Sequence, residues 1–451
     1  FYDWYKRDLA NLVNNHKLHP SIVMWSAGNE LRELWYRPKP ENKSKNPGAT
    51  IANMLVKEFH RLDPSRPVTA GMNQALLDIE MGAAQVFDIL GINYHVNQYD
   101  KTYARSGHGF VLGAETSSTV SSRGVYHFPV VNTCLVGRDK ETRDSLKKAG
   151  ICYADYHNTS YDTEVVSWGN LPDYDWVEQE KPWVIGEFVW TGFDYLGEPT
   201  PYNDVWPSRS SYFGILDLAG LPKDRYYLYR SRWNTTQPTI HLLPHWNWEG
   251  REGEITPIFV YTNYPSAELF INGVSQGVRT KDESIVMENS RGAEAERDLL
   301  RQKRYRLMWM DTTYEPGEVK VVAYDKDGNA VTERVMRTAG APYRIVLEAD
   351  RSTIKANGKD LSFVTVKVVD REGNLCPNAQ HLIKYSVKGA GSYRAGANGD
   401  PTSLELFHKP QMKVFNGMMT AIVQSSEKAG EITLTATAKG LKSAKIVVKT
   451  E

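Results

Sequence analysis

Cysteine is scarce in this sequence, so a disulfide framework is not expected. The 451 residues include only Cys134, Cys152 and Cys376, which lie far apart and lack metal-ligand spacing. An excess of charge is also absent, because 54 Lys and Arg balance 54 Asp and Glu. This balance speaks against nucleic acid and an anionic membrane surface as partners. Long apolar runs are missing too, and we find no candidate transmembrane helix or signal peptide.

Aromatic residues, by contrast, are plentiful. The chain has 12 Trp and 25 Tyr, and an aromatic ring suits the apolar face of a sugar, although core packing is the alternative explanation for most of them. With 41% hydrophobic and 24% charged residues, the chain is expected to be globular and to form two or three domains. The low cysteine content does not distinguish between cellular compartments, because secreted enzymes can lack disulfides and cytosolic enzymes normally lack them.

One stretch indicates where the chemistry lies. The apolar run of residues 22–25 follows Pro20 and leads through small residues to Asn29 and Glu30. This order is typical of a buried parallel strand that carries polar side chains at its carboxyl end. In a (β/α)8 barrel, catalytic groups occupy the carboxyl ends of the strands. The alternative is that Asn29 or Glu30 only caps the next helix.

Residues 19–30, which read HPSIVMWSAGNE, resemble the acid/base signature of glycoside hydrolase family 2. The resemblance implies that Glu30 is the general acid/base and that Asn29 binds the sugar 2-hydroxyl. It also implies a retaining mechanism, which needs a second carboxylate as nucleophile. Glu115 and Glu187 both follow apolar runs, so spacing alone cannot choose between them. The family pattern favours Glu115 and leaves Glu187 as a structural carboxylate or a partner of the nucleophile.

The same resemblance implies further substrate contacts. Tyr94, in the sequence GINYH, is similar to the tyrosine that hydrogen-bonds the nucleophile in this family, and a phenol there favours the ionised carboxylate. Trp190 is similar to the tryptophan of the family's sugar platform. His95, Asp194 and Glu198 are expected to line the pocket. The alternatives are that Tyr94 is an ordinary half-buried tyrosine, that His95 has a structural role, and that Asp194 and Glu198 belong only to a surface loop.

Short apolar runs alternate with helical stretches in the first half of the chain, which indicates a parallel sheet or barrel. Beyond the first strand, strands are expected at residues 68–71, 87–94, 110–115 and 183–190, helices at 4–16 and 51–62, and a polar loop at 37–48. If the strand that ends at Glu30 corresponds to the fourth strand of the family's barrel, these strands correspond to the fourth to the eighth. The chain then supplies about five of the eight strands that a barrel needs. The resemblance therefore implies the C-terminal portion of a longer enzyme, and we expect another segment or chain to supply the first three strands and the N-terminal domains.

Residues 209–224 provide the sequence evidence on which type of sugar the enzyme accepts. Residues 210–215 read SSYFGI and lack the Asn-x-Lys motif with which glucuronidases of this family bind a substrate carboxylate. Arg209 could still bind an acid, so a β-glucuronidase or β-galacturonidase remains the alternative. The segment as a whole is most similar to β-galactosidase-like enzymes of polysaccharide-degrading bacteria, which favours an exo-β-galactosidase in a periplasmic or secreted location. No cofactor is expected, because a divalent cation near Glu30 would need ligands upstream of Phe1.

The second half of the chain has the composition of β-sandwiches, with strand-like runs and Asn-Gly and Asp-Gly turns. We divide the chain into the C-terminal part of a TIM barrel at 1–237 and two immunoglobulin-like sandwiches at 238–340 and 341–451. Residues 279–304 are charged and are expected to form a surface loop. The expected partner is an oligosaccharide, and a homo-oligomer remains open. A carbohydrate-binding or adhesive protein with a degenerate barrel is the alternative of another class.

Overall fold

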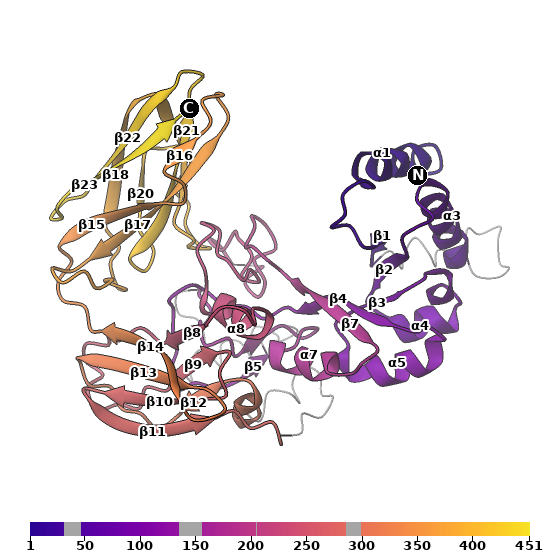
Figure 1. Cartoon of the computed structure of the whole chain (residues 1–451), viewed down its shortest axis with the longest axis horizontal. Coiled ribbons are helices and arrows are strands. Elements are labelled where there is room, and N and C mark those ends of the chain that lie inside the picture. Colours follow the sequence, from indigo (N-terminus) through magenta and orange to yellow (C-terminus); the bar gives the residue numbers. More distant parts are fainter. Residues whose placement is uncertain (31–46, 135–155, 204, 286–298) are drawn as a thin grey trace. The chain divides into compact units, whose positions relative to one another are not determined.

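A computed structural model describes residues 1–30, 47–134, 156–203, 205–285 and 299–451 (Figure 1). These residues form two compact units. The first contains residues 1–118 and 165–190, and the second contains the remaining described residues. No described helix has the length and apolar character needed to cross a membrane.

The first unit is built on one parallel sheet. Its strand order is β1-β2-β3-β4-β7, and each neighbouring pair runs parallel. The strands are β1 (Trp25–Asn29), β2 (Val68–Met72), β3 (Leu90–Asn93), β4 (Val111–Ser117) and β7 (Val184–Trp190). All five predicted strands are therefore present. In the described residues they form an open sheet with β1 and β7 at its edges, as expected for strands four to eight of a barrel.

The position of the first strand differs from its prediction. The apolar run at 22–25 was expected to be the strand, but the strand begins at Trp25. The reason is that the carbonyl oxygen of Ile22 accepts a hydrogen bond from Arg66 Nε at 2.7 Å, so it does not join the sheet. Only from Trp25 onward does the backbone pair with β2, with Trp25 opposite Val68.

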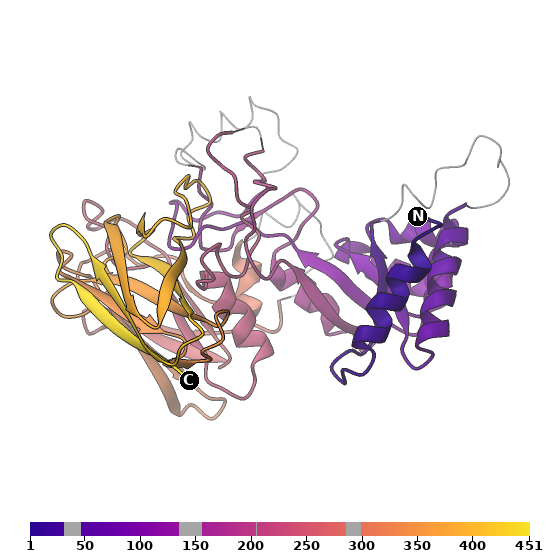
Figure 2. The same cartoon turned by 90° about the horizontal axis from the view of Figure 1, so that it is seen from above.

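Helices alternate with these strands, as the sequence predicts. They are α1 (Tyr5–His16), α3 (Pro47–Leu62), α4 (Ala75–Glu80), α5 (Tyr99–Ser106) and α7 (Pro172–Gln179), with 3-10 turns η1 (Ala84–Val86) and η2 (Val96–Gln98). Helices α1 and α3 pack side by side (Figure 2). Val13 and Phe59 from these helices join Leu90 and Ile92 in one buried core. Most of the loop predicted at 37–48 lies outside the described residues, and its last two positions begin α3.

The second unit contains helix α8 (Asp224–Trp233), a two-stranded sheet of β5 (Thr133–Cys134) and β6 (Glu164–Val165), and two sandwiches. The first sandwich packs the sheet β11-β10-β13-β14 against β12-β9-β8. Its strands are β8 (Ile240–Leu243), β9 (Ile258–Thr262), β10 (Ser266–Ile271), β11 (Val274–Thr280), β12 (Leu307–Trp309), β13 (Glu318–Tyr324) and β14 (Ala330–Arg337). The surface loop expected at 279–304 is not all loop, because it contains the end of β11 and the 3-10 turn η4 (Leu299–Arg304); residues 286–298 lie outside the described residues.

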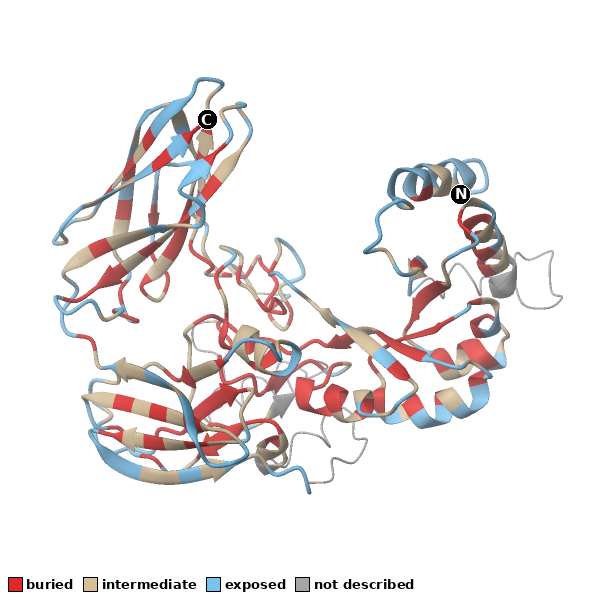
Figure 3. Ribbon diagram, in the orientation of Figure 1, coloured by how far each residue is buried: buried red, intermediate tan, exposed pale blue. Residues whose placement is uncertain are grey.

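The second sandwich packs the sheet β15-β17-β21-β19 against β16-β23-β22-β18-β20. Its strands are β15 (Arg344–Ala349), β16 (Thr353–Ile354), β17 (Leu361–Val369), β18 (Leu382–Gly389), β19 (Gly391–Ala397), β20 (Gln411–Lys413), β21 (Met418–Ser425), β22 (Gly430–Thr437) and β23 (Ala444–Thr450). Alternate residues of β17, including Val364 and Val366, are buried, as in a strand with one face on a core (Figure 3). Cys376 is buried in the same core, and burial raises the pKa of its thiol to about 11. A thiol of this kind is unreactive.

Candidate active site

The carboxyl ends of β1 and β4 bring two predicted site residues into contact. Asn29 Nδ2 donates a hydrogen bond to Glu115 Oε1 at 2.6 Å. Tyr94, which follows β3, donates its hydroxyl to the other oxygen, Glu115 Oε2, at 2.9 Å. Both oxygens of Glu115 therefore accept a hydrogen bond, and donors of this kind favour the ionised carboxylate.

Glu30 belongs to the same network through a residue that the sequence analysis did not single out. Asn93, the last residue of β3, is fully buried. Its Nδ2 lies 2.9 Å from Asn29 Oδ1 and 2.9 Å from Glu30 Oε1, so it bridges the two. Two amide side chains thus connect Glu30 to Glu115. Asn29 and Glu30 are exposed at this end of the sheet, and Glu115 is half-buried.

A glycine in β2 makes room for these amides. A Cβ atom at Gly71 would lie 2.2 Å from Asn29 Oδ1 and 2.7 Å from Asn93 Oδ1. Both distances are far inside van der Waals contact, so a larger residue would push the amides away. The Gly71 carbonyl also accepts the Glu30 backbone N–H at 2.9 Å. Gly71 is the last residue of the strand predicted at 68–71, and nothing in the local sequence marks it as part of the site.

The backbone turns sharply where the strands deliver these side chains. Glu30, Tyr94, His95, Ser117 and Ser118 have φ values of 51°, 56°, 51°, 67° and 65°. These lie in the left-handed region, which residues other than glycine rarely occupy and which concentrates at functional sites. The corner at Tyr94 is held by a hydrogen bond from its N–H to the Glu115 carbonyl at 2.7 Å.

Ser118 completes a chain of hydroxyl groups behind Glu115. Its Oγ donates to the Tyr94 hydroxyl oxygen at 2.9 Å, and the side chains of both residues are buried. Burial and then the charge of Glu115 raise the pKa of the Tyr94 phenol well above its usual value. Tyr94 therefore keeps its proton and remains a donor to Glu115. No sequence pattern marks Ser118 as a site residue, because serines are common where a chain turns after a strand.

Glu187, the other candidate nucleophile, has different partners. Thr116 Oγ1 donates to Glu187 Oε2 at 2.6 Å, and Trp176 Nε1 of helix α7 donates to Oε1 at 3.1 Å. Burial, followed by the charge of Glu187, raises the pKa of the neighbouring Asp175 well above its usual value. Glu187 thus contacts helix α7, and its hydrogen-bond donors, Thr116 and Trp176, differ from Asn29 and Tyr94, which donate to Glu115.

The remaining predicted site residues are distributed over both units. His95 follows Tyr94 directly and contacts Gln98 through Nδ1 at 3.1 Å. Trp190 ends β7, is half-buried and pairs with Ser117 of β4 through the backbone. Asp194, Glu198 and Arg209 belong to the second unit.

Asp194 was expected to line the pocket, but the structure buries it. Its carboxylate lies 2.7 Å from Lys223 Nζ and accepts the Gly214 N–H at 2.7 Å. Burial raises the pKa of Asp194 to about 6, although Lys223 opposes the shift. Glu198 is exposed and accepts a hydrogen bond from the Tyr195 hydroxyl. Among the described residues, no group of three or more His, Cys, Asp or Glu side chains is placed to hold a metal ion.

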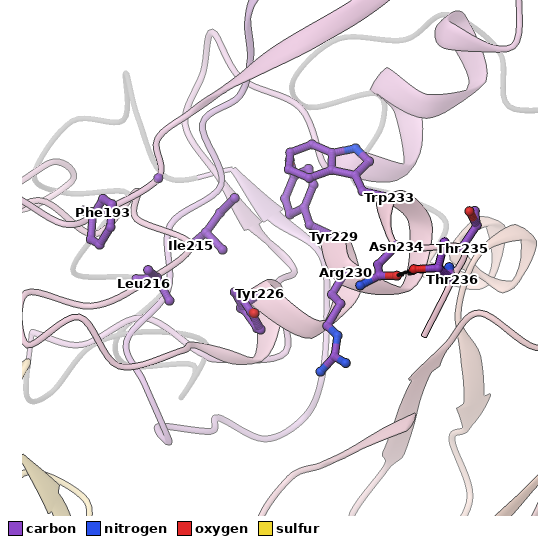
Figure 4. Close-up of a pocket in the computed structure, with 11 residues that line it drawn as sticks. Phe193, Ile215, Leu216, Tyr226, Tyr229, Arg230, Trp233, Asn234, Thr235 and Thr236 are labelled. Carbon is purple, nitrogen blue, oxygen red and sulfur yellow. Dashed lines mark hydrogen bonds between the residues drawn. The ribbon is translucent and has the colours of Figure 1, made fainter. Parts of the chain in front are cut away.

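A separate cavity of about 570 Å³ lies in the second unit, between helix α8 and residues 192–216 (Figure 4). Phe193, Tyr226, Tyr229 and Trp233 supply its aromatic lining. Asn234 contacts Thr236 at its polar end. None of the predicted site residues lines this cavity, so we do not assign the catalytic chemistry to it.

Family models match most of the chain. Residues 4–216 match the TIM barrel domain of glycosyl hydrolases family 2, and residues 345–447 match C-terminal domain 5 of glycoside hydrolase family 2. The chain belongs to glycoside hydrolase family 2. Between these two matches, residues 253–332 of this family 2 chain match a domain of unknown function, DUF4982.

Individual relatives agree with the family models. A β-galactosidase of Bacteroides ovatus, BoGH2A, is 37% identical over all of this chain and 52% of its own length. A putative β-glucuronidase of Formosa agariphila is 27% identical over 89% of this chain and 36% of its own length. The crystal structure of a β-glycosidase from Bacteroides vulgatus matches the whole chain with a TM-score of 0.77 and 29% identity, over 53% of that structure. This family 2 chain therefore spans about half the length of these relatives or less.

Proposed function

We propose that this protein is a retaining exo-β-glycosidase that removes terminal β-galactosyl residues. The observation that supports it is the hydrogen-bonded set of Glu30, Asn93, Asn29 and Glu115 at the carboxyl ends of three parallel strands. Catalytic groups of a TIM barrel lie at these strand ends. The β-galactosidase of Bacteroides ovatus supports the choice of sugar.

The proposed reaction uses the two carboxylates in turn. Glu115, kept ionised by Asn29 and Tyr94, attacks the anomeric carbon, and Glu30 donates its proton to the leaving oxygen. The product of this step is a glycosyl-enzyme ester on Glu115. Glu30 then removes a proton from water, which attacks the same carbon and releases the sugar with its original configuration. In this proposal the Asn29 amide donates to the sugar 2-hydroxyl once the sugar enters.

β-Glucuronides and β-galacturonides are the second candidate substrates. One observation favours them, namely the putative β-glucuronidase among the relatives. Against them stands the segment 210–215, which lacks the Asn-x-Lys motif. A galactoside therefore remains our first choice.

We also propose that another polypeptide segment covers the open sheet of the first unit. Ile185 and Phe188 of the edge strand β7 are exposed, and so is Val23 just before the edge strand β1. Open sheet edges with exposed apolar side chains aggregate unless they are covered. Mass spectrometry of the purified native protein would test this proposal, which fails if only these 451 residues are present in an active, monodisperse enzyme.

The activity is tested on the protein as its gene encodes it, with nitrophenyl β-galactoside, β-glucuronide, β-galacturonide and β-mannoside. A 2-fluoro galactoside should trap the intermediate, and peptide mass mapping should place the added sugar on Glu115. Glu115→Ala should abolish turnover, while Glu187→Ala serves as a matched control on the neighbouring strand. Label on Glu187, or near-normal turnover by Glu115→Ala, would reverse the assignment.

A further inference from the structure

The second sandwich carries a pocket that combines an apolar floor with two arginine side chains. The pocket has a volume of about 480 Å³. Its floor is the outer face of the β15-β17-β21-β19 sheet, where Ile422 lies opposite Phe363 on one side and Ala395 on the other. The adjacent residues Val364 and Ala421 point into the core instead. The main lining residues are Leu361, Ala395 and Ile422 from the sheet, together with Arg209, Arg394 and Phe407.

A β-bulge directs Arg394 toward this pocket. In β19, Tyr393 pairs with Val423 and Ala395 pairs with Ile422, so Arg394 is an extra residue without a partner across the ladder. Bulges of this kind turn a side chain away from the regular alternation and are frequent next to functional sites. Arg394 is exposed and lines the pocket.

Arg209 enters the same pocket from a different part of the chain. Its guanidinium carbon lies 5.4 Å from the centre of the Phe407 ring. Its backbone N–H donates to the Pro401 carbonyl at 3.2 Å, so the loop of the sandwich fixes its position. The Arg209 Nη2 donates to the Glu405 backbone carbonyl at 3.5 Å. Within the described residues, neither Arg209 nor Arg394 forms an ion pair with a carboxylate.

The sandwich is fastened to the segment that carries Arg209. Arg123 Nε forms a buried ion pair with Asp217 Oδ2 at 2.5 Å. Its Nη2 donates to the carbonyl oxygens of Asn398 at 2.8 Å and Phe415 at 3.0 Å, both in loops of the sandwich. These bonds tie Asp217, which lies eight positions after Arg209, to the loops of the sandwich that flank β19 and β20, and Arg209 and Arg394 line the same pocket.

We propose that this pocket binds a uronic acid residue of an acidic polysaccharide or oligosaccharide. The two guanidinium groups match a carboxylate, which arginine binds with paired, charge-assisted hydrogen bonds. The apolar floor and Phe407 suit the carbon face of a sugar ring. The one carboxylate in the lining, that of Glu405, is already engaged by the Lys413 backbone N–H at 3.0 and 3.2 Å. The inference rests on the proposed glycosidase function only for the expectation that the ligand is a glycan.

The test measures binding of tetragalacturonic acid and of neutral galactotetraose to the complete protein by isothermal titration calorimetry. The wild type should bind the acidic tetrasaccharide more tightly than the neutral one. Arg394→Gln should raise Kd for the acidic ligand by about 10-fold, the effect of losing one charged hydrogen bond. Phe407→Ala should weaken binding of both ligands. The matched control is Lys384→Gln, which removes one exposed positive charge from β18 in the opposite sheet and should change neither Kd.

The calorimetric results distinguish a uronide pocket from a surface with no preference for acidic glycans. Equal affinity for the two ligands, no measurable binding, or an equal effect of Arg394→Gln and Lys384→Gln would overturn the pocket assignment. Hydrolysis of nitrophenyl galactoside is measured separately on the same samples. Uronide binding that depends on Arg394, without hydrolysis of any glycoside, would leave this inference standing and would remove the proposed catalytic function instead.

Discussion

Asn29 and Glu115 lie 86 positions apart in the chain, yet their side chains meet at 2.6 Å. The contact exists because β1 and β4 run parallel and end at the same edge of the sheet. The amide reaches Glu115 from one side and is itself held by Asn93 from the other. This relationship makes Asn29 part of the environment of Glu115, the proposed nucleophile, as well as a candidate ligand of the sugar.

Replacing Asn29 with alanine should therefore lower kcat/KM by on the order of 10²-fold, the usual cost of losing one preorganised donor. Steady-state kinetics on nitrophenyl galactoside provide the measurement. Asn15→Ala removes an exposed amide of α1 and serves as the control. Unchanged kcat/KM in Asn29→Ala would show that the contact has no part in catalysis.

Ser118 should act on Glu115 only through Tyr94. Ser118→Ala removes the donor to the phenol oxygen, and Tyr94→Phe removes the phenol itself. We expect each variant to lower kcat and to shift the acidic limb of the pH profile upward, because the ionised form of Glu115 loses support.

A double-mutant cycle separates this chain of contacts from a purely structural effect. In the Tyr94→Phe background, Ser118→Ala should have almost no additional effect on kcat. Additive losses in the double variant would mean that Ser118 acts by another route.

Gly71→Ala should disturb the site without replacing any polar group. The new methyl would overlap Asn29 Oδ1 and Asn93 Oδ1, so we expect a loss of activity and a decrease of about 1–3 kcal/mol in the free energy of unfolding. Activity and urea unfolding are measured together. Gly109→Ala is the matched control, since its added Cβ meets no atom within 4 Å. If the two variants behave alike, the close packing around Gly71 is not essential.

Asp63 should make the first unit sensitive to acid. Hydrogen bonds from Ser65, then Arg66 and Trp25, lower the pKa of this buried carboxyl well below its usual value, against the opposing effect of burial. A pKa lowered in the folded state stabilises the protein above the unfolded value of about 4, and this contribution is lost as the pH falls further.

Asp63→Asn should therefore lower the free energy of unfolding by about 2 kcal/mol near pH 7, the contribution of hydrogen bonds to a charged group. The difference from the wild type should shrink below pH 4, because the unfolded state then takes up a proton on Asp63 while the folded state still keeps this carboxylate charged. Urea unfolding at several pH values tests this, with the exposed Asp3→Asn as control. A difference that stays constant from pH 7 to pH 3 would contradict the assignment.

The sequence predicted the parallel sheet well, because each of its strands is a short apolar run that ends in polar residues. The same pattern could not tell Glu115 from Glu187, since it does not show on which side of the sheet a side chain points. Register shifts between Gly113 and Thr116 interrupt the regular alternation of β4 against β7. Resemblance to a family, and not the spacing, favoured Glu115.

Other features depend on contacts that no local pattern records. Asn93 and Gly71 matter because strands far apart in sequence place them beside Asn29. The resemblance to the family led us to expect Asp194 at a pocket surface, but Lys223, just before α8, forms a buried ion pair with it. A lysine 29 positions later gives no signal in the sequence around Asp194.

The left-handed corners at Glu30, Tyr94 and Ser118 constrain any attempt to make this protein more heat-tolerant. Glycine is the replacement that would relieve such a corner, but here it would also delete a side chain of the proposed machinery. Screens for thermostable variants should therefore collect their useful changes in the two sandwiches and leave these three codons untouched.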